Sequence, residues 1–526
     1  MTTTSPTTPA STLADDPPAM SHREVLEAMS GLLLGMFVAI LSSTVVSTAL
    51  PEIIGDLGGS QSSYTWVVTA TLLALTVSTP IWGKLADLYP RKTLVQTGLV
   101  IYTTGSILAG LSETTSFLIG CRVIQGIGVG GLTALVQVIL ADLVSPRERG
   151  RYAGYLGAVF GLGTVVGPLI GGVLTDGLGW RWCFYVGVPF AVAAFIVLQR
   201  TLHLPPRPRR KAYLDFPGAL LVAGGVSALL IWVSLAGTQF DWASWQTVAL
   251  VALGFLLSIG ALFVMRRAPE PLIPLRLFRD RTIVIAVLAS VAVGVVMFGT
   301  TVFLTQYMQI ARAKSPTESG LLTIPMVGGL LISSIVVGRR VSGTGVYKPY
   351  MITGATLLTL GLFLMGTLDE TTHLGILAVF MVILGSGIGM LMQNLVLVVQ
   401  NSLQLGDIGA GSALVAFMRS LGGAVGVSAL GALLAHHAAT TIAAGLTDLG
   451  VKAGAAGGNA VPDVGSLPEP VAHVVEHGYG TAIGEIFLVA APLGLLVVFL
   501  MLSLPAKPLG QRSGIQRAAE TGAAPA

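Results

Sequence analysis

Two arginines inside apolar segments are the residues whose chemistry most needs an explanation. Arg122 lies in Cys121-Arg-Val-Ile-Gln-Gly-Ile-Gly128, and Arg419 lies in Phe417-Met-Arg-Ser-Leu-Gly-Gly423. A charge within a membrane-length apolar segment is costly unless it faces a cavity or a partner, so both arginines are functional candidates. The alternative for Arg122 is a structural role, with carbonyl oxygens and Gln125 as its partners. Arg419 would bind an anionic or polar group of a substrate, or pair with an acid.

A second chemical pattern lies near the C-terminus. His473-Val-Val-Glu-His477 has the form H-x-x-E-H of some zinc peptidases, in which His473, Glu476 and His477 would act together. The stretch borders an apolar segment, and only one membrane helix and a polar tail follow it. An interfacial helix leading into that last segment is the better interpretation. We therefore expect no metal, no catalytic residue and no enzymatic activity.

The first charged cluster after two apolar segments is Gly83-Lys-Leu-Ala-Asp-Leu-Tyr-Pro-Arg-Lys-Thr93. It places the carboxylate of Asp87 among cations that include Arg91. Gly83 has no side chain, which lets two helices approach closely, and Pro90 prevents a continuous helix. Cations in a short loop between membrane-length segments indicate the cytoplasmic side.

The composition places these residues in a membrane protein. The chain has 526 residues, of which 53% are apolar and 10% are charged, whereas soluble proteins carry about 25% charged residues. It is therefore predicted to be an all-α polytopic membrane protein in a lipid bilayer. Its two cysteines cannot form a disulfide framework. No G-x-x-x-x-G-K-[ST] loop is present, so ATP is not the expected energy source, and we expect no nucleic-acid partner.

Fourteen segments are long and apolar enough to be transmembrane helices. Most of the 29 Lys and Arg residues lie in alternate loops and in the two tails, which predicts cytoplasmic N and C termini. The predicted spans are 29–50, 64–83, 93–111, 116–140, 152–174, 182–199, 216–236, 245–265, 282–306, 319–338, 349–367, 374–399, 409–434 and 481–503.

The loops divide these spans into two six-helix bundles with two spans inserted between them. Such halves are typical of transporters with a substrate site near the midplane. The predicted parts are a cytoplasmic tail 1–28, an N-terminal bundle 29–199, linkers and inserted spans 200–281, a C-terminal bundle 282–503 with an extracellular loop at about 435–480, and a cytoplasmic tail 504–526.

Several motifs resemble the major facilitator superfamily, and in particular its fourteen-span drug:proton antiporter family. The pattern G-K-L-A-D-x-x-x-R-K resembles that superfamily's loop between spans two and three, which implies that Asp87 and Arg91 help lock the inner ends of the two halves together. R-x-x-Q-G-x-G resembles the fourth-span motif of its drug exporters, which implies that Arg122 takes part in proton coupling. F-x-R-S-x-G-G around Arg419 also resembles the fourteen-span family.

The fifth predicted span carries the main indication of transport direction. Its sequence Gly161-Leu-Gly-Thr-Val-Val-Gly-Pro-Leu-Ile-Gly-Gly172 resembles the antiporter motif found in exporters of the superfamily. The alternative is a face of small residues for helix packing. The motif residues are Gly163, Gly167, Pro168, Gly171 and Gly172.

The chain departs from the family pattern in its first span and after its fifth. Leu41-Ser-Ser-Thr-Val-Val-Ser-Thr-Ala-Leu-Pro51 has Ser42 where the family usually has an acid. Gly187 replaces the usual Asn of a W-R-W-x-F-x-x-N-x-P pattern. Because a proton antiporter needs a group that titrates, and serine does not titrate, the proton-binding residue is unassigned.

Polar residues in or near the spans are the candidate lining of a substrate cavity. For Gln393 and Asn394 the alternative is hydrogen bonding between helices. The candidates are Ser42, Gln125, Gln306, Tyr307, Gln393, Asn394 and Arg419.

The resemblance implies a secondary active exporter in the plasma membrane. We expect it to export a small amphipathic compound such as a drug or antibiotic, to use the proton gradient instead of a cofactor, and to be a monomer. A lipid or metabolite exporter of the same fold, an importer and a membrane metalloenzyme are the alternatives.

Overall fold

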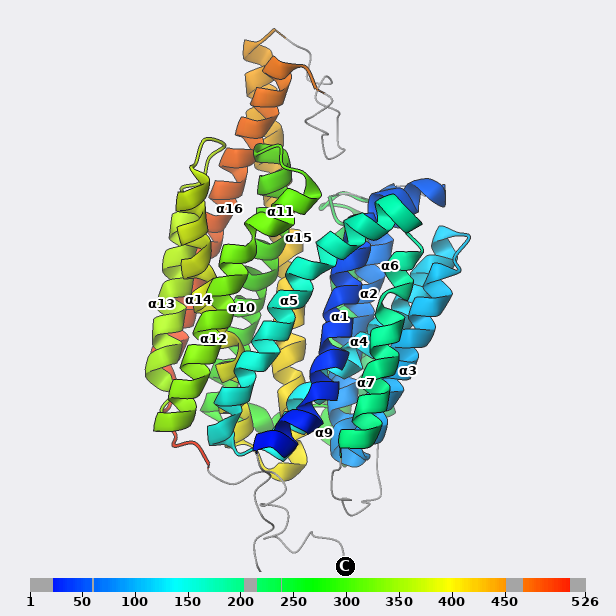
Figure 1. The fold of residues 1–526 in the computed structure, drawn as a ribbon, viewed down its shortest axis with the longest axis vertical. Coiled ribbons are helices and arrows are strands. Elements are labelled where there is room, and N and C mark those ends of the chain that lie inside the picture. The colour runs from blue at the N-terminus through cyan, green and yellow to red at the C-terminus, as the bar shows by residue number, and fades with distance from the viewer. Residues whose placement is uncertain (1–21, 59–60, 203–214, 238, 451–466, 511–526) are drawn as a thin grey trace, which may run out of the picture.

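The computed structural model describes residues 22–58, 61–202, 215–237, 239–450 and 467–510, which are helical with no β-strand among them (Figure 1). Most of the predicted N-terminal tail, the basic segment 204–211 and the end of the C-terminal tail lie outside these ranges. The helices are α1 (His22–Asp56), α2 (Gln61–Leu88), α3 (Arg91–Gly110), α4 (Thr115–Leu143), α5 (Pro146–Leu178), α6 (Trp182–Tyr185), α7 (Gly187–Thr201), α8 (Phe216–Leu235), α9 (Trp245–Arg267), η1 (Leu275–Arg279), α10 (Arg281–Gln306), η2 (Tyr307–Ala311), α11 (Pro316–Leu322), α12 (Ile324–Thr344), α13 (Lys348–Met365), α14 (Leu374–Ser402), η3 (Leu405–Asp407), α15 (Ile408–Asp448) and α16 (Glu469–Ser503).

Thirteen helical segments of the described chain are long and apolar enough to cross a membrane. α3 is not among them, because Gln96, Thr97, Thr103 and Ser106 make it more polar than the others. α3 is nevertheless 20 residues long and packs against α4 and α7. Together with α3, the long helices correspond to the fourteen predicted spans.

Two groups of helices form the molecule. In one group α1 packs on α5 and α7, and α2 and α3 pack on α4. In the other, α10 packs on α15, α12 and α13 pack on α14, and α16 packs on α13 and α15. The groups meet through α2 with α15 and through α5 with α12. The inserted pair α8 and α9 pack on each other, and α8 also contacts both α2 and α15, so it lies along the seam between the halves.

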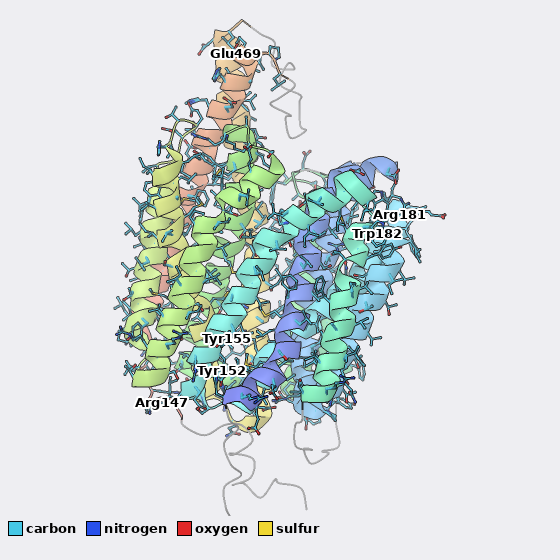
Figure 2. All side chains as sticks on the ribbon, viewed as in Figure 1. Arg147, Tyr152, Tyr155, Arg181, Trp182 and Glu469 are labelled. Carbon is cyan, nitrogen blue, oxygen red and sulfur yellow. The ribbon has the colours of Figure 1, made fainter. Side chains whose placement is uncertain are left out.

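We call the end at which α1 begins and α16 ends the inner end, and the opposite end the outer end (Figure 1). The prediction that the inner end faces the cytoplasm stays a prediction. At the outer end α15 and α16 project well beyond the neighbouring helices, as Figure 2 shows for Glu469 at the tip. The predicted loop 435–480 is therefore largely helical, with residues 451–466 outside the described chain.

The stretch around His473 is helical and continues without a break into the last predicted span, because both belong to α16. Its location at a membrane interface stays a prediction. Gly478 lies against Ile442, and Gly445 lies against Val474. These close contacts pair the ends of α15 and α16 with each other.

Candidate functional site

The two halves are joined at the inner end by Asp87. Its Oδ1 accepts a hydrogen bond from Gly409 N and its Oδ2 accepts one from Ala410 N, both at 2.9 Å. These N–H groups belong to the first turn of α15, where the helix has no partners of its own for them and where the helix dipole favours an anion. A carboxylate at the end of α2 thus holds the beginning of a helix in the other half.

Arg91 is buried beside this contact. Its Nη2 lies 3.6 Å from Asp87 Oδ1, and its Nη1 forms an ion pair with Asp142 Oδ2 on α4. Its Nε also donates to the carbonyl oxygen of Ala86 at 3.0 Å. The structure therefore brings Asp87 and Arg91 together as the motif implied, and adds Asp142 as a third charge.

Gly83 lies directly against α15. A Cβ at this position would lie 2.8 Å from the carbonyl oxygen of Gly409 and would collide with the side chain of Ala413. Any side chain here would push α2 and α15 apart. Glycine at position 83 therefore allows α2 to approach α15, and Asp87 of α2 caps the first turn of that same helix.

Amide and guanidinium groups add further contacts between the halves near the inner end. Gln137 Nε2 donates to Gln393 Oε1 at 3.1 Å, and Arg149 Nη1 donates to Gln400 Oε1 at 2.8 Å. Arg147, which Figure 2 places at the inner end, donates through Nη2 to the carbonyl oxygen of Gly343 at 2.7 Å. Of these residues, only Gln393 was predicted from the sequence to be a site residue. The sequence does not indicate which distant residue a polar side chain will contact.

Two glycine faces on α5 contact two different helices. The motif residues Gly163, Gly167 and Gly171 pack on α1, against Ile40, Thr44 and Val45 respectively. Thr44 Oγ1 also donates to the carbonyl oxygen of Gly163 at 3.1 Å. Pro168 instead lies near α11, with its Cβ 3.6 Å from a Cβ built on Gly320. Gly172 is half-buried.

The second face of α5 was not among the predicted site residues. Gly150, Gly154, Gly157 and Gly161 all pack on α12, and a Cβ at Gly150 would lie 2.5 Å from the carbonyl oxygen of Gly338. Their spacing of four, three and four residues places them on one side of a helix, which is a signal the sequence does contain. α5 therefore packs closely on α1 in its own half and on α12 in the other half.

Arg122 lies in a buried polar network at the contact of α1, α3 and α4. Its Nη1 donates to Gln125 Oε1 at 2.5 Å. Gln125 Nε2 in turn donates to Ser42 Oγ at 2.8 Å and to Ser106 Oγ at 2.7 Å. Gln125, the side chain named in the structural alternative for Arg122, thus contacts this arginine and connects three helices.

Several predicted cavity residues do not line an open cavity in this structure. Gln125 is 0% exposed. Tyr307 is also fully buried, and its hydroxyl donates to the carbonyl oxygen of Asp369 at 2.6 Å. Asn394 is buried and donates to the carbonyl oxygen of Met390 in its own helix. The cause is the same for all three, because a polar side chain in an apolar segment hydrogen-bonds to the nearest backbone or side chain.

Three further candidates are less completely paired or less buried. Gln393 is buried, with its Nε2 unpaired and its Oε1 bonded to Gln137. Gln306 and Arg419 are half-buried. No carboxylate of the described residues forms an ion pair with Arg419, and the backbone of Arg419 packs tightly against Gly294 of α10.

The histidines of the H-x-x-E-H stretch have separate partners. His473 Nδ1 lies 3.3 Å from Glu476 Oε2, and His477 Nδ1 lies 2.9 Å from Glu370 Oε1 in the loop between α13 and α14. In the part of the chain that the structure describes, no three His, Cys, Asp or Glu side chains are grouped as metal ligands. The geometry gives the metalloenzyme alternative no support.

At the outer end of the N-terminal half, Trp180 Nε1 donates to Asp56 Oδ2 at 2.8 Å. Arg181 lies 3.3 Å from the same oxygen, and its guanidinium stacks 4.2 Å from the centre of the Trp180 ring. The hydrogen bond from Trp180, assisted by Arg181, lowers the pKa of Asp56. Figure 2 shows Arg181 on this outer surface. The contact connects the end of α1 to the segment between α5 and α6.

Comparison with known proteins agrees with this arrangement. The family model described as Major Facilitator Superfamily matches residues 32–427. The uncharacterized MFS-type transporter Rv1877 of Mycobacterium tuberculosis (strain ATCC 25618 / H37Rv) is 35% identical in an alignment of 530 residues that covers 98% of this chain and 76% of that protein. The multidrug transporter protein MdtP of Bacillus subtilis (strain 168) is 36% identical over 406 residues, which are 77% of this chain and 74% of that protein.

A solved structure supports the fold independently. The proton:xylose symporter XylE superposes with a TM-score of 0.61 at 15% sequence identity, over 95% of this chain and 100% of that one. At this identity the likeness concerns the fold alone. The family match over most of the chain and the two relatives establish that this chain belongs to the Major Facilitator Superfamily.

Proposed function

We propose that this chain is a secondary active exporter that moves amphipathic organic compounds out of the cell by alternating access, coupled to proton influx. The observation that carries the proposal is the inner contact of Asp87 with the first turn of α15. It joins the two halves by hydrogen bonds between separate helices, so it can open and close without any change in covalent structure. An alternating-access transporter needs such a contact at one end of its substrate path.

Two observations favour export of amphipathic compounds. The relative MdtP is named a multidrug transporter. The glycines of the antiporter motif, Gly163, Gly167 and Gly171, hold α5 against α1. The proposal places both termini in the cytoplasm, the chain in the plasma membrane and its function in a monomer.

Where the proton binds is the open part of this proposal. Among the described helices, Glu485 is the acid farthest from a helix end, and its carboxylate contacts His437 Nδ1 on α15. Both side chains are partly exposed, so water can reach them. This pair is the first position at which to test proton coupling.

The test uses purified protein in liposomes that contain a pH-sensitive dye. A proton gradient is imposed, and amphipathic antibiotics, dyes and lipids are added one at a time. Proton entry that depends on a compound, together with movement of that compound, would support antiport. Glu485→Gln should abolish proton entry if the pair binds the proton, whereas Glu113→Gln at the outer surface serves as the control.

The outcome separates the proposal from its rivals. Transport of lipids alone would favour a lipid exporter of the same fold. Compound movement without proton entry would contradict proton coupling while leaving export intact. Accumulation of compounds by energised cells would contradict export.

A further inference from the structure

Arg122 is a buried cation without a buried anion. Its side chain is 4% exposed, and its Nε is enclosed with no hydrogen-bond acceptor. Its contacts are the neutral Gln125 Oε1 at 2.5 Å and the ring of Phe184, whose centre lies 6.0 Å from its Cζ. Among the described residues, no carboxylate forms an ion pair with Arg122. A buried charge of this kind is strongly unfavourable unless a counter-charge reaches it.

The groups around Arg122 are all neutral. Ser42 Oγ and Ser106 Oγ both accept hydrogen bonds from Gln125 Nε2, and the Tyr102 hydroxyl interacts with the side chains of both serines. A guanidinium has only donors, and the Nε donor of Arg122 has no acceptor. The network therefore leaves the Arg122 charge without an anion and one of its donors without a partner.

Gly187 leaves room for the Tyr102 hydroxyl. A Cβ at position 187 would overlap the hydroxyl oxygen of Tyr102, so a larger residue at this position would displace that hydroxyl. As a glycine, residue 187 supplies no side-chain acceptor to the network.

All four polar residues of the network are buried. Gln125 and Ser106 are 0% exposed, Arg122 is 4% exposed and Ser42 is 5% exposed. Arg122 on α4 and Ser42 on α1 are connected through Gln125. Ser42 is also the position at which the first-span motif of the resembling family carries an acid.

We propose that Arg122 and Ser42 bind a monovalent anion, which takes the place of the missing carboxylate. The anion accepts hydrogen bonds from the Arg122 guanidinium and the Ser42 hydroxyl. Chloride and the carboxylate of an amphipathic solute share this chemistry. This inference concerns binding and does not depend on the proposed export function.

The test measures the apparent melting temperature of the purified full-length protein. Sodium chloride is titrated against sodium gluconate at constant ionic strength, and decanoate is compared with methyl decanoate in the gluconate buffer. We expect chloride, decanoate or both to raise the melting temperature saturably, and methyl decanoate to have no such effect. A response to chloride alone identifies an inorganic anion as the ligand. A decanoate response that competes with chloride identifies the solute carboxylate.

Three variants make the result specific. Ser42→Asp supplies a fixed carboxylate, so it should melt in gluconate at least as high as the wild type in chloride and should lose the anion response. Arg122→Gln should weaken the anion response by about tenfold or more, because it removes a hydrogen bond to a charged group. Arg147→Gln, at the inner end, is the matched control and should keep the response.

Absence of any anion response in the folded wild type would overturn the proposal. So would a response that persists unchanged in both Ser42→Asp and Arg122→Gln. If Arg122→Gln fails to fold, Ser42→Asp alone decides, because it is expected to be the more stable protein.

Discussion

The carboxylate of Asp87 caps the first turn of α15 by accepting a hydrogen bond from the backbone N–H of Gly409, which lies 322 residues further along the chain. One side chain of the N-terminal half thus satisfies backbone groups at the beginning of a helix in the C-terminal half. Buried Arg91 lies beside this carboxylate and pairs on its other side with Asp142. We call the contact of Asp87 with the first turn of α15 the inner lock.

Replacing Asp87 by Asn should weaken this lock. The amide keeps the size of the side chain but loses the charge, and the expected loss is about 1–3 kcal/mol for hydrogen bonds to a charged group. Hydrogen exchange followed by mass spectrometry should detect faster exchange at Gly409 and Ala410. Unchanged exchange there would contradict the lock, and Glu113→Gln is the control for a lost surface charge.

Gly83→Val should separate α2 from α15. The new side chain would collide with Ala413 and with the carbonyl oxygen of Gly409, so we expect lower transport in the liposome assay and a lower melting temperature. Gly120→Ala is the matched control, because a Cβ at Gly120 meets nothing within 4 Å. Equal effects of the two substitutions would mean that close approach at Gly83 is unimportant.

Gly167→Ala tests the contact of α5 with α1. A Cβ at Gly167 would overlap the Thr44 side chain, and overpacking of this kind typically destabilises by about 1–3 kcal/mol. Apparent melting temperature and export rate are the measurements. Adding Thr44→Ala, which removes the Oγ1 atom that the new Cβ would overlap, should recover part of the loss. No recovery would mean that the glycine acts in some other way.

The linker after α9 should stabilise the inner end through ion pairs. Lys84 on α2 lies 3.2 Å from Glu270, and Arg276 lies 2.7 Å from Asp407 beside the start of α15. Because these pairs are partly exposed, a double-mutant cycle of Lys84→Met and Glu270→Gln should give a coupling of about 1 kcal/mol or less. Melting in low and high salt should show that the coupling shrinks as salt rises. A coupling of zero in low salt would contradict the prediction.

The outer contact of Asp56 predicts a pH dependence. The folded-state pKa of Asp56 is lowered, chiefly by the hydrogen bond from Trp180 and also by Arg181. Its stabilising contribution is therefore present above the unfolded pKa of roughly 4 and is lost as pH falls through the lowered folded value. The difference in melting temperature between wild type and Asp56→Asn should be constant at neutral pH and should disappear in acid. A difference that grows in acid would contradict this sign.

The sequence predicted much of the helical architecture because the signals for it are local. An apolar run of about 20 residues, bounded by charges or Pro, predicts a membrane-length helix without knowledge of its neighbours. The motif around Asp87 likewise contains its own loop, glycine and charges within one short segment. The spacing of Gly150, Gly154, Gly157 and Gly161 was equally available, but spacing alone does not say which helix a glycine face will contact.

Predictions failed where a residue's role depends on partners far away in the chain. Tyr307 was a candidate for the lining of a substrate cavity, and in the structure its buried hydroxyl donates a hydrogen bond to the carbonyl oxygen of Asp369. The segment 435–480 was expected to be a loop, because Ala and Gly carry little apolar signal. It is largely helical because α15 and α16 pack on each other through Gly445 and Gly478.

By itself, the sequence determined the class of protein, the number of long helices and the positions of its intramembrane charges, because burial of apolar residues and the cost of a charge in lipid act residue by residue. Only the tertiary structure decided which charges are neutralised. Asp87, Arg91 and Asp142 meet at the inner end, whereas Arg122 meets only neutral groups such as Gln125. The physical reason is that an ion pair depends on the distance between two side chains, and helix packing sets that distance.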